Sequence, residues 1–381
     1  MSLEKAQQWL EKIQTLDLPD KVKIMNVCGG HERTISHAGI RGLLPQNIEL
    51  IPGPGCPVCI CPEEDIFLAI QLALHEDIIL VAFGDMLRVP VNVAKKEVRT
   101  LEQARAAGAD IRPVSSPIEV INIARNCGGK KVIFFAAGFE TTTAPVAAMI
   151  AEGLPENLFI LLSGRLTWPA VSMLLESGDP GFDALVAPGH VSTVMGGQEW
   201  QFVGEKHHLP VAIAGFEAES MLAALYSVLR QKQQHRLFLD NCYAEVVHPG
   251  GNKTAQRLLK TTMDVVDSNW RGIGIIPASG FALNKSYASH DARLVFKDYS
   301  DDTRRRIGEM PPGCDCAKVV LGKIYPDQCR LFGAGCNPEK PVGPCMVSDE
   351  GACHIWWNTR TQKPSLANTP HEINKSEVEL V

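Results

Sequence analysis

The chain has 381 residues, of which 45% are hydrophobic and 21% are charged, and its formal net charge at pH 7 is −6. A chain of this length and composition has room for two or three globular domains. The weakly negative charge gives no broad electrostatic reason to bind nucleic acid. Nucleic-acid-binding functions are therefore disfavoured from the start.

The N-terminal segment MSLEKAQQWLEKIQ carries charges throughout and lacks the apolar core of a secretory signal. We expect an amphipathic helix there. The apolar runs also fall short of the roughly 18 residues that a membrane span needs. The sequence thus predicts a cytoplasmic protein with no membrane segment. In a reducing compartment, its twelve cysteines favour metal or redox chemistry over a disulfide framework.

Between about residues 20 and 240, short apolar runs alternate with helical patterns, which predicts parallel α/β layers. The strand-like runs are KIMNV, IELI, IILVAF, KKVIFFAA, LFILLS, FDALVA and PVAIAG. Two helices are predicted at Pro62–His75, with a proline in the first turn, and at Ala218–Arg230. The fold class is therefore α/β.

A weak internal repeat predicts two related lobes with a cleft between them. The segment AAGFETTTAPVAAMI near 137–150 is similar to AIAGFEAESMLAALY near 212–226, and each is predicted as a strand, Gly-Phe-Glu and a helix. The run NCGGKK at 126–131 is a candidate joint. We expect lobe I at 1–127, lobe II at 128–240 and a C-terminal iron–sulfur region at 241–381.

Six cysteines crowd into the C-terminal region between glycines and prolines. They are Cys314, Cys316, Cys329, Cys336, Cys345 and Cys353. An iron–sulfur cluster takes about four thiolates from backbone that can wrap around it. A zinc site or a set of disulfides is the alternative, but zinc usually takes two close Cys-x2–4-Cys knuckles, which this region lacks. The spacing favours a cluster.

An earlier segment, GPGCPVCICPEED, places Cys56 and Cys59 as a Cys-x-x-Cys pair just before the helix predicted at Pro62. The positive end of a helix dipole lowers a thiol pKa, and thiolates serve both metal ligation and thiol–disulfide exchange. The pair is therefore a candidate redox dithiol or metal site. Half of a structural zinc site is the alternative. The neighbouring Cys61 has no assigned role.

Cys28 lies in the segment VCGGHERT, in which a predicted strand ends in a Gly-Gly turn and a helix starts near His31. The glycines allow another group to approach the backbone closely. His31 and Glu32 are near enough in sequence to hydrogen-bond or polarise a ligand on Cys28. Helix capping is an equally ordinary role for either side chain.

Further polar side chains follow apolar strands, at Asp85, Glu140 and His190. Ligands of open α/β sheets bind outside the carboxyl ends of the strands, so these loops and Cys28 are expected to converge on one crevice. For His190, a structural hydrogen-bonded role is the alternative. Neither a P-loop nor a G-x-G-x-x-G after a strand is present, so no nucleotide cofactor is predicted.

In its motifs VCGGHE, GPGCPVCI, AGFETT, PGHVS and GPCMVSDEGAC the sequence closely resembles the HypD family of [NiFe]-hydrogenase maturation proteins. The resemblance spans most of the chain and keeps the motif order. It implies two α/β lobes, a cluster-bearing region, and a scaffold on which iron receives cyanide and carbon monoxide. The segment VVHPGGNK lacks the expected Glu before Gly-Asn, which puts a role for Asn241 and Tyr243 in doubt.

The resemblance also implies partners and ligands. Cys28 would hold iron, here Fe(II), together with a cysteine of a HypC-type small chaperone. A HypE-type protein would bring the cyanide, and the iron would pass to the hydrogenase large subunit. The cluster, a [4Fe–4S] type, would be held by Cys314, Cys329, Cys336 and Cys353. Cys316 and Cys345 would be left to pair with each other.

These residues combine into a hypothesis for the chemistry. Cys28 and a partner thiolate hold the iron, a soft-donor arrangement suited to strong-field ligands. Backbone amides at the Gly-Gly turn and at the helix after Glu140 bind cyanide, and His190 ligates iron or donates a hydrogen bond. The Cys56/Cys59 dithiol supplies electrons. Two rivals are an iron–sulfur-linked thiol–disulfide oxidoreductase and a binding module with a structural metal.

Overall fold

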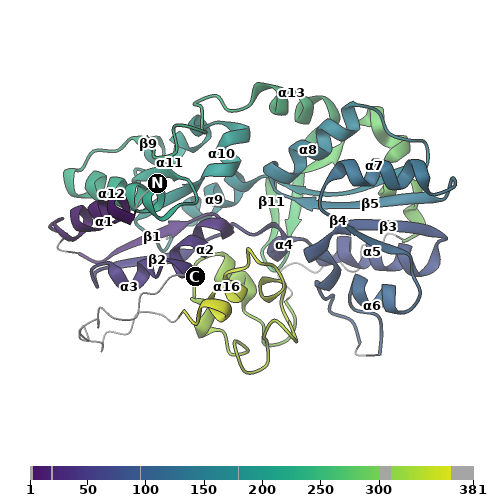
Figure 1. Ribbon diagram of the computed structural model, residues 1–381, viewed down its shortest axis with the longest axis horizontal. Helices are drawn as coiled ribbons and strands as arrows, with labels where there is room; N and C mark the ends of the chain where they lie inside the picture. Colours follow the sequence, from purple (N-terminus) through teal and green to yellow (C-terminus); the bar gives the residue numbers. More distant parts are fainter. Residues whose placement is uncertain (1–2, 19, 95, 179, 300–309, 362–381) are drawn as a thin grey trace.

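The computed structural model describes residues 3–18, 20–94, 96–178, 180–299 and 310–361. Two α/β lobes lie side by side, and the C-terminal module, residues 310–361, lies beneath their junction (Figure 1). This confirms the predicted α/β class with parallel-sheet lobes and a cysteine-rich C-terminal region. Within these ranges, no helix combines the length and apolar character needed to cross a membrane.

The first lobe contains a five-stranded parallel sheet in the order β2-β1-β7-β8-β9. Its strands are β1 (Val22–Asn26), β2 (Ile48–Pro52), β7 (Ala184–Pro188), β8 (Val211–Ala214) and β9 (Leu239–Asn241). Successive side chains of a strand point to opposite faces, so Ile24 and Met25 enter different cores. The sheet is therefore covered by helices on both faces.

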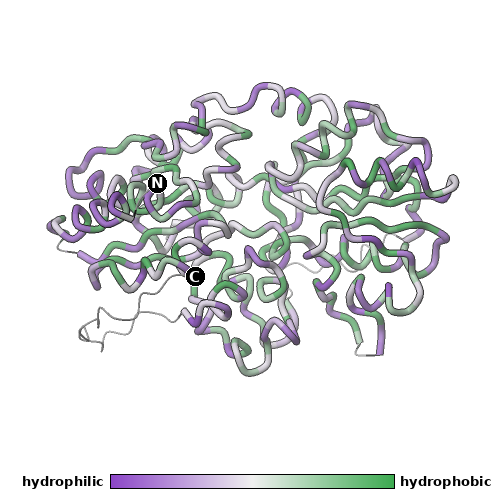
Figure 2. Tube along the Cα trace, in the orientation of Figure 1, coloured by the Kyte–Doolittle hydropathy of each residue, from purple (hydrophilic) through white to green (hydrophobic). Residues whose placement is uncertain are grey.

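One face of this sheet packs against four helices: α1 (Leu3–Gln14), α2 (Gly29–His37), α3 (Ile40–Leu43) and α12 (Ala218–Gln234). The other face packs against α9 (Thr167–Glu176), α10 (Gly189–Met195) and α11 (Gln201–Glu205). Hydrophobic residues follow the inner strands, whereas the outer helices α1 and α12 carry many polar ones (Figure 2).

The second lobe contains a six-stranded sheet in the order β10-β11-β6-β5-β3-β4. Its strands are β3 (Ile78–Phe83), β4 (Ile111–Val114), β5 (Lys131–Gly138), β6 (Leu158–Arg165), β10 (Met263–Trp270) and β11 (Gly274–Leu283). Strands β3 to β6 are parallel, and the β10–β11 hairpin joins β6 in antiparallel orientation. This hairpin had no counterpart among the predicted strands.

Helices cover both faces of the second sheet as well. Helices α5 (Glu63–His75) and α6 (Leu101–Ala106) lie on one face. Helices α7 (Pro117–Asn126), α8 (Glu140–Ala151) and α13 (Lys253–Thr262) lie on the other. Strand β3 supplies both cores, because Leu80 faces the α5 side and Val81 the α7 side. This explains its uninterrupted apolar sequence.

The sheets do not follow the expected boundary at residue 127. The chain builds β1 and β2 in the first lobe, crosses to the second for β3 to β6, returns for β7 to β9, and crosses again for β10 and β11. The run NCGGKK is a turn between α7 and β5 of one lobe, and Gly128 and Gly129 adopt positive φ angles there. Each lobe is thus discontinuous in sequence.

The repeated Gly-Phe-Glu segments do occupy equivalent places in the two lobes. Strand β5 leads through Phe139 to α8 in the second lobe, and β8 leads through Phe216 to α12 in the first. Each segment therefore follows a parallel strand and opens a helix. The repeat marks one such unit per lobe, although it did not reveal where the lobes divide.

The C-terminal module has little regular structure and packs against both lobes. Its helices are α15 (Cys316–Val320) and α16 (Ala352–Thr359). Trp356 of α16 is fully buried in a core shared with the first sheet, whereas Val319 of α15 joins the core of the second lobe. The module therefore bridges the lobes on the side where Cys28 lies.

Candidate functional site

Cys28 lies in the short connection between β1 and α2, where its extended backbone forms the N-cap of the helix. A Cβ at Gly55 would collide with the backbone of Cys28, and one at Gly29 would collide with Glu350 of the C-terminal module. Gly29 also donates its backbone N–H to the Gly55 carbonyl at 3.1 Å. Glycine is therefore needed at both positions, because three distant segments meet here.

The thiol of Cys28 is half-buried, and both a carboxylate and backbone N–H groups influence its pKa. Burial raises its pKa to about 12, and the nearby Glu350 carboxylate adds to this, while the backbone N–H groups of His31 and Gly30 lower it. The two amides are thus directed at the sulfur. They could support an anion or a metal-bound thiolate at this position.

Cys56 and Cys59 form a disulfide beside Cys28. They flank α4 (Pro57–Ile60), a separate short helix that precedes α5, and the Cys59 backbone N–H lies 3.2 Å from the Cys56 sulfur. Pro62, predicted to begin the longer helix, is the N-cap of α5 instead. The two cysteines are 4% and 2% exposed, so the pair is buried.

One small cavity brings the separate cysteine systems together. Cys28, Cys56 and Cys59 line it, as do Cys345 and Glu350 of the C-terminal module. Cys28 and the Cys56–Cys59 pair come from two separate segments of the first 60 residues, and Cys345 and Glu350 come from a third segment near residue 350. The three segments therefore share one site. The loops predicted to converge on a crevice with Cys28 do not line this cavity at Asp85, Glu140 or His190.

In the C-terminal module, the sulfurs of Cys316, Cys345 and Cys353 lie within 4.8 Å of one another, and all three residues are buried. Cys314 lies beside Cys316, because a Cβ at Gly343 would collide with both of their sulfurs. Hydrogen bonds from Cys316 and Cys353 lower the pKa of Cys345. Buried sulfur atoms are soft donors, and Gly343 packs closely against two of them. The group therefore suits a metal or cluster bound by thiolates.

This arrangement differs from the ligand set that the resemblance implied. Of the expected ligands Cys314, Cys329, Cys336 and Cys353, the compact group contains only Cys353. Cys316 and Cys345 are free thiols, so the expected pairing between them is absent here. Both residues instead face Cys353, because the start of α15 and the turn before α16 bring their sulfurs toward it.

His31 is fully buried and turned away from the cavity. Its Nε2 lies 2.9 Å from the Ala214 carbonyl, and burial lowers the pKa of the ring to about 4. Nδ1 has no hydrogen-bond partner among the described residues. The imidazole is therefore neutral at pH 7. The contact of His31 with the Cys28 sulfur is made by its backbone N–H.

His190, at the start of α10, is exposed and stacks on Phe216 with ring centroids 3.8 Å apart. Phe216 also contacts the ring of His31, at 5.2 Å, and would collide with a side chain at Gly30. Phe216 therefore connects His190 to the Cys28 loop by packing. The ring of His190 does not line the cysteine cavity itself.

Glu140 is fully buried at the start of α8 and does not line the cysteine cavity. Its carboxylate accepts hydrogen bonds from the backbone N–H and the hydroxyl of Thr167, at 2.7 and 2.8 Å. Burial raises its pKa to about 7. Burial and the charge of Glu140 also raise the pKa of Glu199 in the first lobe. Glu140 thus belongs to a carboxyl pair between the lobes.

Glu32 is the central polar residue beneath the site. Its buried carboxylate accepts hydrogen bonds from Arg41 at 2.8 Å, Asn26 at 3.0 Å and the Trp356 indole at 2.6 Å. The charge of Arg41 keeps the pKa of Glu32 low despite burial, which opposes it. The carboxylate therefore ties β1, α2 and α3 to α16. No sequence pattern indicates this link, because Trp356 is 324 residues away.

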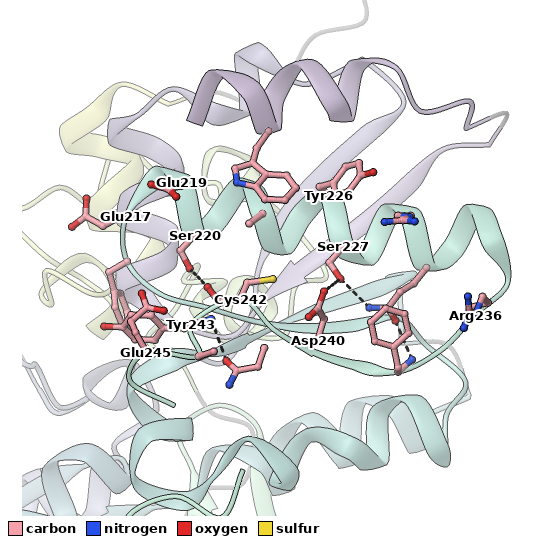
Figure 3. A pocket seen from close by; sticks show the side chains of 18 of the residues that line it. Glu217, Glu219, Ser220, Tyr226, Ser227, Arg236, Asp240, Cys242, Tyr243 and Glu245 are labelled. Carbon is pink, nitrogen blue, oxygen red and sulfur yellow. Dashed lines mark hydrogen bonds between the residues drawn. The ribbon is translucent and has the colours of Figure 1, made fainter. Parts of the chain in front are cut away.

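A larger pocket, with a volume of about 700 Å³, has Phe216 among its lining residues and is shown in Figure 3. Its lining includes Asn241 and Tyr243, whose roles the sequence left in doubt. Asn241 donates to the Val247 carbonyl at 2.8 Å and accepts from the Tyr243 backbone N–H at 3.1 Å. Both residues thus shape the loop after β9.

Comparison of the sequence with known proteins identifies the family of this chain. A family model named HypD and described as "Hydrogenase formation hypA family" matches residues 4–360. The chain belongs to the HypD family. It is 41% identical over 345 residues to the hydrogenase maturation factor HypD2 of Bradyrhizobium diazoefficiens, covering 88% of each chain.

Other members of the HypD family give similar values. The hydrogenase maturation factor HypD of Escherichia coli is 38% identical over 350 residues, or 90% of each chain. That of Rhodobacter capsulatus is 39% identical over 343 residues, which are 88% of this chain and 89% of the relative. The family assignment supports a general function in hydrogenase maturation, and the buried cysteine group is consistent with metal or iron–sulfur binding.

Proposed function

We propose that this HypD-family chain is a scaffold on which the Fe(CN)2CO unit of [NiFe]-hydrogenase is assembled. The observation that carries the proposal is the shared cavity of Cys28, the Cys56–Cys59 pair and Cys345. A scaffold that binds iron and also delivers electrons to its ligands needs a metal-binding thiol beside a redox pair. Membership of the chain in the HypD family supports a role in hydrogenase maturation.

Iron is the cargo in this proposal, and Cys28 is its ligand from this chain. The second thiolate comes from a HypC-type chaperone docked over the half-buried Cys28. Thiolates are soft donors that suit iron carrying strong-field ligands. The backbone N–H groups of Gly30 and His31 offset negative charge on the Cys28 sulfur. His190 stacks on Phe216, which packs against the Cys28 loop. From the exposed side, its ring would ligate the iron or donate a hydrogen bond to the diatomic ligands.

The Cys56/Cys59 dithiol supplies electrons when cyanide leaves the sulfur of a HypE-type carrier. The bond between carrier sulfur and cyano carbon breaks, and the carbon keeps the bonding pair and binds iron. The carrier sulfur gains two electrons and one proton from the dithiol, which closes to a disulfide and releases its second proton. In this proposal, the disulfide between Cys56 and Cys59 is the oxidised product of the step.

The C-terminal cysteines would hold the resident cofactor. A [4Fe–4S] cluster bound there would supply single electrons. We propose Cys314, Cys329, Cys336 and Cys353 as its ligands, and the compact group of Cys316, Cys345 and Cys353 is the competing ligand set.

Infrared spectroscopy of protein purified without oxygen together with its chaperone tests the assembly function. We expect iron-bound cyanide and carbon monoxide stretching bands, which Cys56→Ser and Cys59→Ser should each abolish because the electron source is lost. Unchanged bands in both variants would refute the redox role. A protein that reduces its disulfide but never shows the bands would be a thiol–disulfide oxidoreductase instead.

Single Cys→Ser variants test the cluster ligands. We expect Cys353→Ser and Cys329→Ser to lose the visible absorption and labile sulfide of the cluster, and Cys316→Ser to retain both. Iron and sulfide content after anaerobic reconstitution is the measurement. Loss in Cys316→Ser with retention in Cys329→Ser would contradict the proposed set and assign the ligands to the compact group.

A further inference from the structure

Arg271, in the turn between β10 and β11, is a buried cation with unused hydrogen-bond donors. The residue is 3% exposed. Its Nη2 donates to the Pro90 carbonyl at 2.7 Å and lies 3.4 Å from a carboxylate oxygen of Glu63. Nε and Nη1 have no partner within the described part of the chain. Three of the five N–H donors of the guanidinium are therefore free.

Unused donors on a buried charged group are costly, because the group has given up its hydrogen bonds to water without replacing them. The fold avoids this cost at Arg165, whose side chain is equally buried. Its guanidinium donates to the carbonyls of Asn269 and Gly164 at 2.9–3.2 Å. Nε and Nη1 of Arg271 lack such acceptors among the described residues, which indicates an acceptor that arrives with a bound group.

The turn that carries Arg271 packs directly on the C-terminal module. A Cβ at Gly272 would lie 2.8 Å from Cβ of Ala317, the residue after Cys316. Trp270, on the other side of Arg271, shares one apolar cluster with Cys316, Cys336, Cys345 and Cys353. Arg271 is therefore at the boundary between the second lobe and the cysteine group.

We propose that Arg271 is a positioning residue that gives positive charge and hydrogen bonds to a cysteine-held iron–sulfur cluster in the C-terminal module and raises its reduction potential. The inference rests on the proposed cluster function of that module. Net charge and hydrogen bonds to the sulfurs set the potential of such clusters. Reduction adds negative charge, which a buried guanidinium stabilises more strongly than a solvated one.

Arg271 also reaches the disulfide segment. Its backbone N–H donates to the carbonyl of Ile60 at 3.0 Å, next to Cys59 in α4. The same residue therefore contacts the element that carries the redox pair and lies in the turn that packs on the C-terminal module. A cluster whose reduction potential is raised by Arg271, and which lies beside α4, is suited to exchange electrons with the Cys56–Cys59 pair.

Redox titration of the anaerobically reconstituted full chain tests the inference, with the midpoint potential followed by visible absorption and electron paramagnetic resonance. In Arg271→Met, we expect the equilibrium for reduction to weaken at least tenfold, which for a one-electron couple is about 59 mV toward negative potential. Arg271→Lys, which keeps the charge but loses the planar donors, should fall between Arg271→Met and the unaltered protein.

Arg330→Met is the matched control, because Arg330 is exposed and adjoins Cys329. Its loss changes the net charge equally, but solvent screens the effect. Equal shifts in the two Met variants, or no shift in Arg271→Met, would overturn the inference. If Arg271→Met takes up no cluster, an unchanged potential in Arg271→Lys would overturn it. Zinc without iron in the unaltered protein would refute the proposed function instead.

Discussion

Replacing Cys28 by Ser should remove every infrared band of iron-bound cyanide and carbon monoxide while the visible absorption of the cluster persists. The hydroxyl of Ser is a hard and weakly acidic donor, so it cannot replace a thiolate on this iron. The C-terminal cysteines lie in another segment of the chain and keep their own packing. Infrared and visible spectra of the same anaerobic sample provide the measurement.

Cys127→Ser is the control for this experiment. Cys127 lies in the second lobe, where its thiol donates to the carbonyls of Ala124 and Lys130, and it does not line the cysteine cavity. Its variant should retain the bands at full intensity. Bands that persist in Cys28→Ser would contradict the assignment of Cys28 as the iron ligand, and loss in both variants would point to general instability.

Glu32→Ala should lower the free energy of unfolding by about 3–5 kcal/mol, the range for breaking a buried ion pair from one side. Arg41, whose side chain is 7% exposed, would be left without its carboxylate, and the Trp356 indole would lose its acceptor. The C-terminal module would then separate more easily from α2. Urea unfolding followed by circular dichroism measures the loss.

Glu176→Ala provides a comparison for Glu32→Ala. Glu176 also forms a close ion pair, with Lys206 at 2.6 Å, but both side chains are more than half exposed. Pairs of this kind contribute little, so stability should change only slightly. A similar small change in Glu32→Ala would show that the carboxylate does not hold the C-terminal module to the first lobe.

The sequence by itself was sufficient for the seven strands that its apolar runs predicted and for the thiol motifs. Apolar runs such as IILVAF became buried parallel strands because a strand between two helical layers needs hydrophobic residues on both faces. The spacing of Cys56 and Cys59 is enough to permit a disulfide within a single turn of chain. Both features depend on neighbouring residues, which a sequence pattern records.

Only the tertiary structure decided which strands share a sheet and which side chains share a site. The lobes are discontinuous, since β7 pairs with β1 across about 160 residues, and no local pattern encodes that partnership. The same holds for Glu32 with Trp356 and for Glu350 beside Cys28, which meet because α16 packs on α2. Contacts between distant segments arise from packing of whole surfaces, so they appear only once the chain is folded.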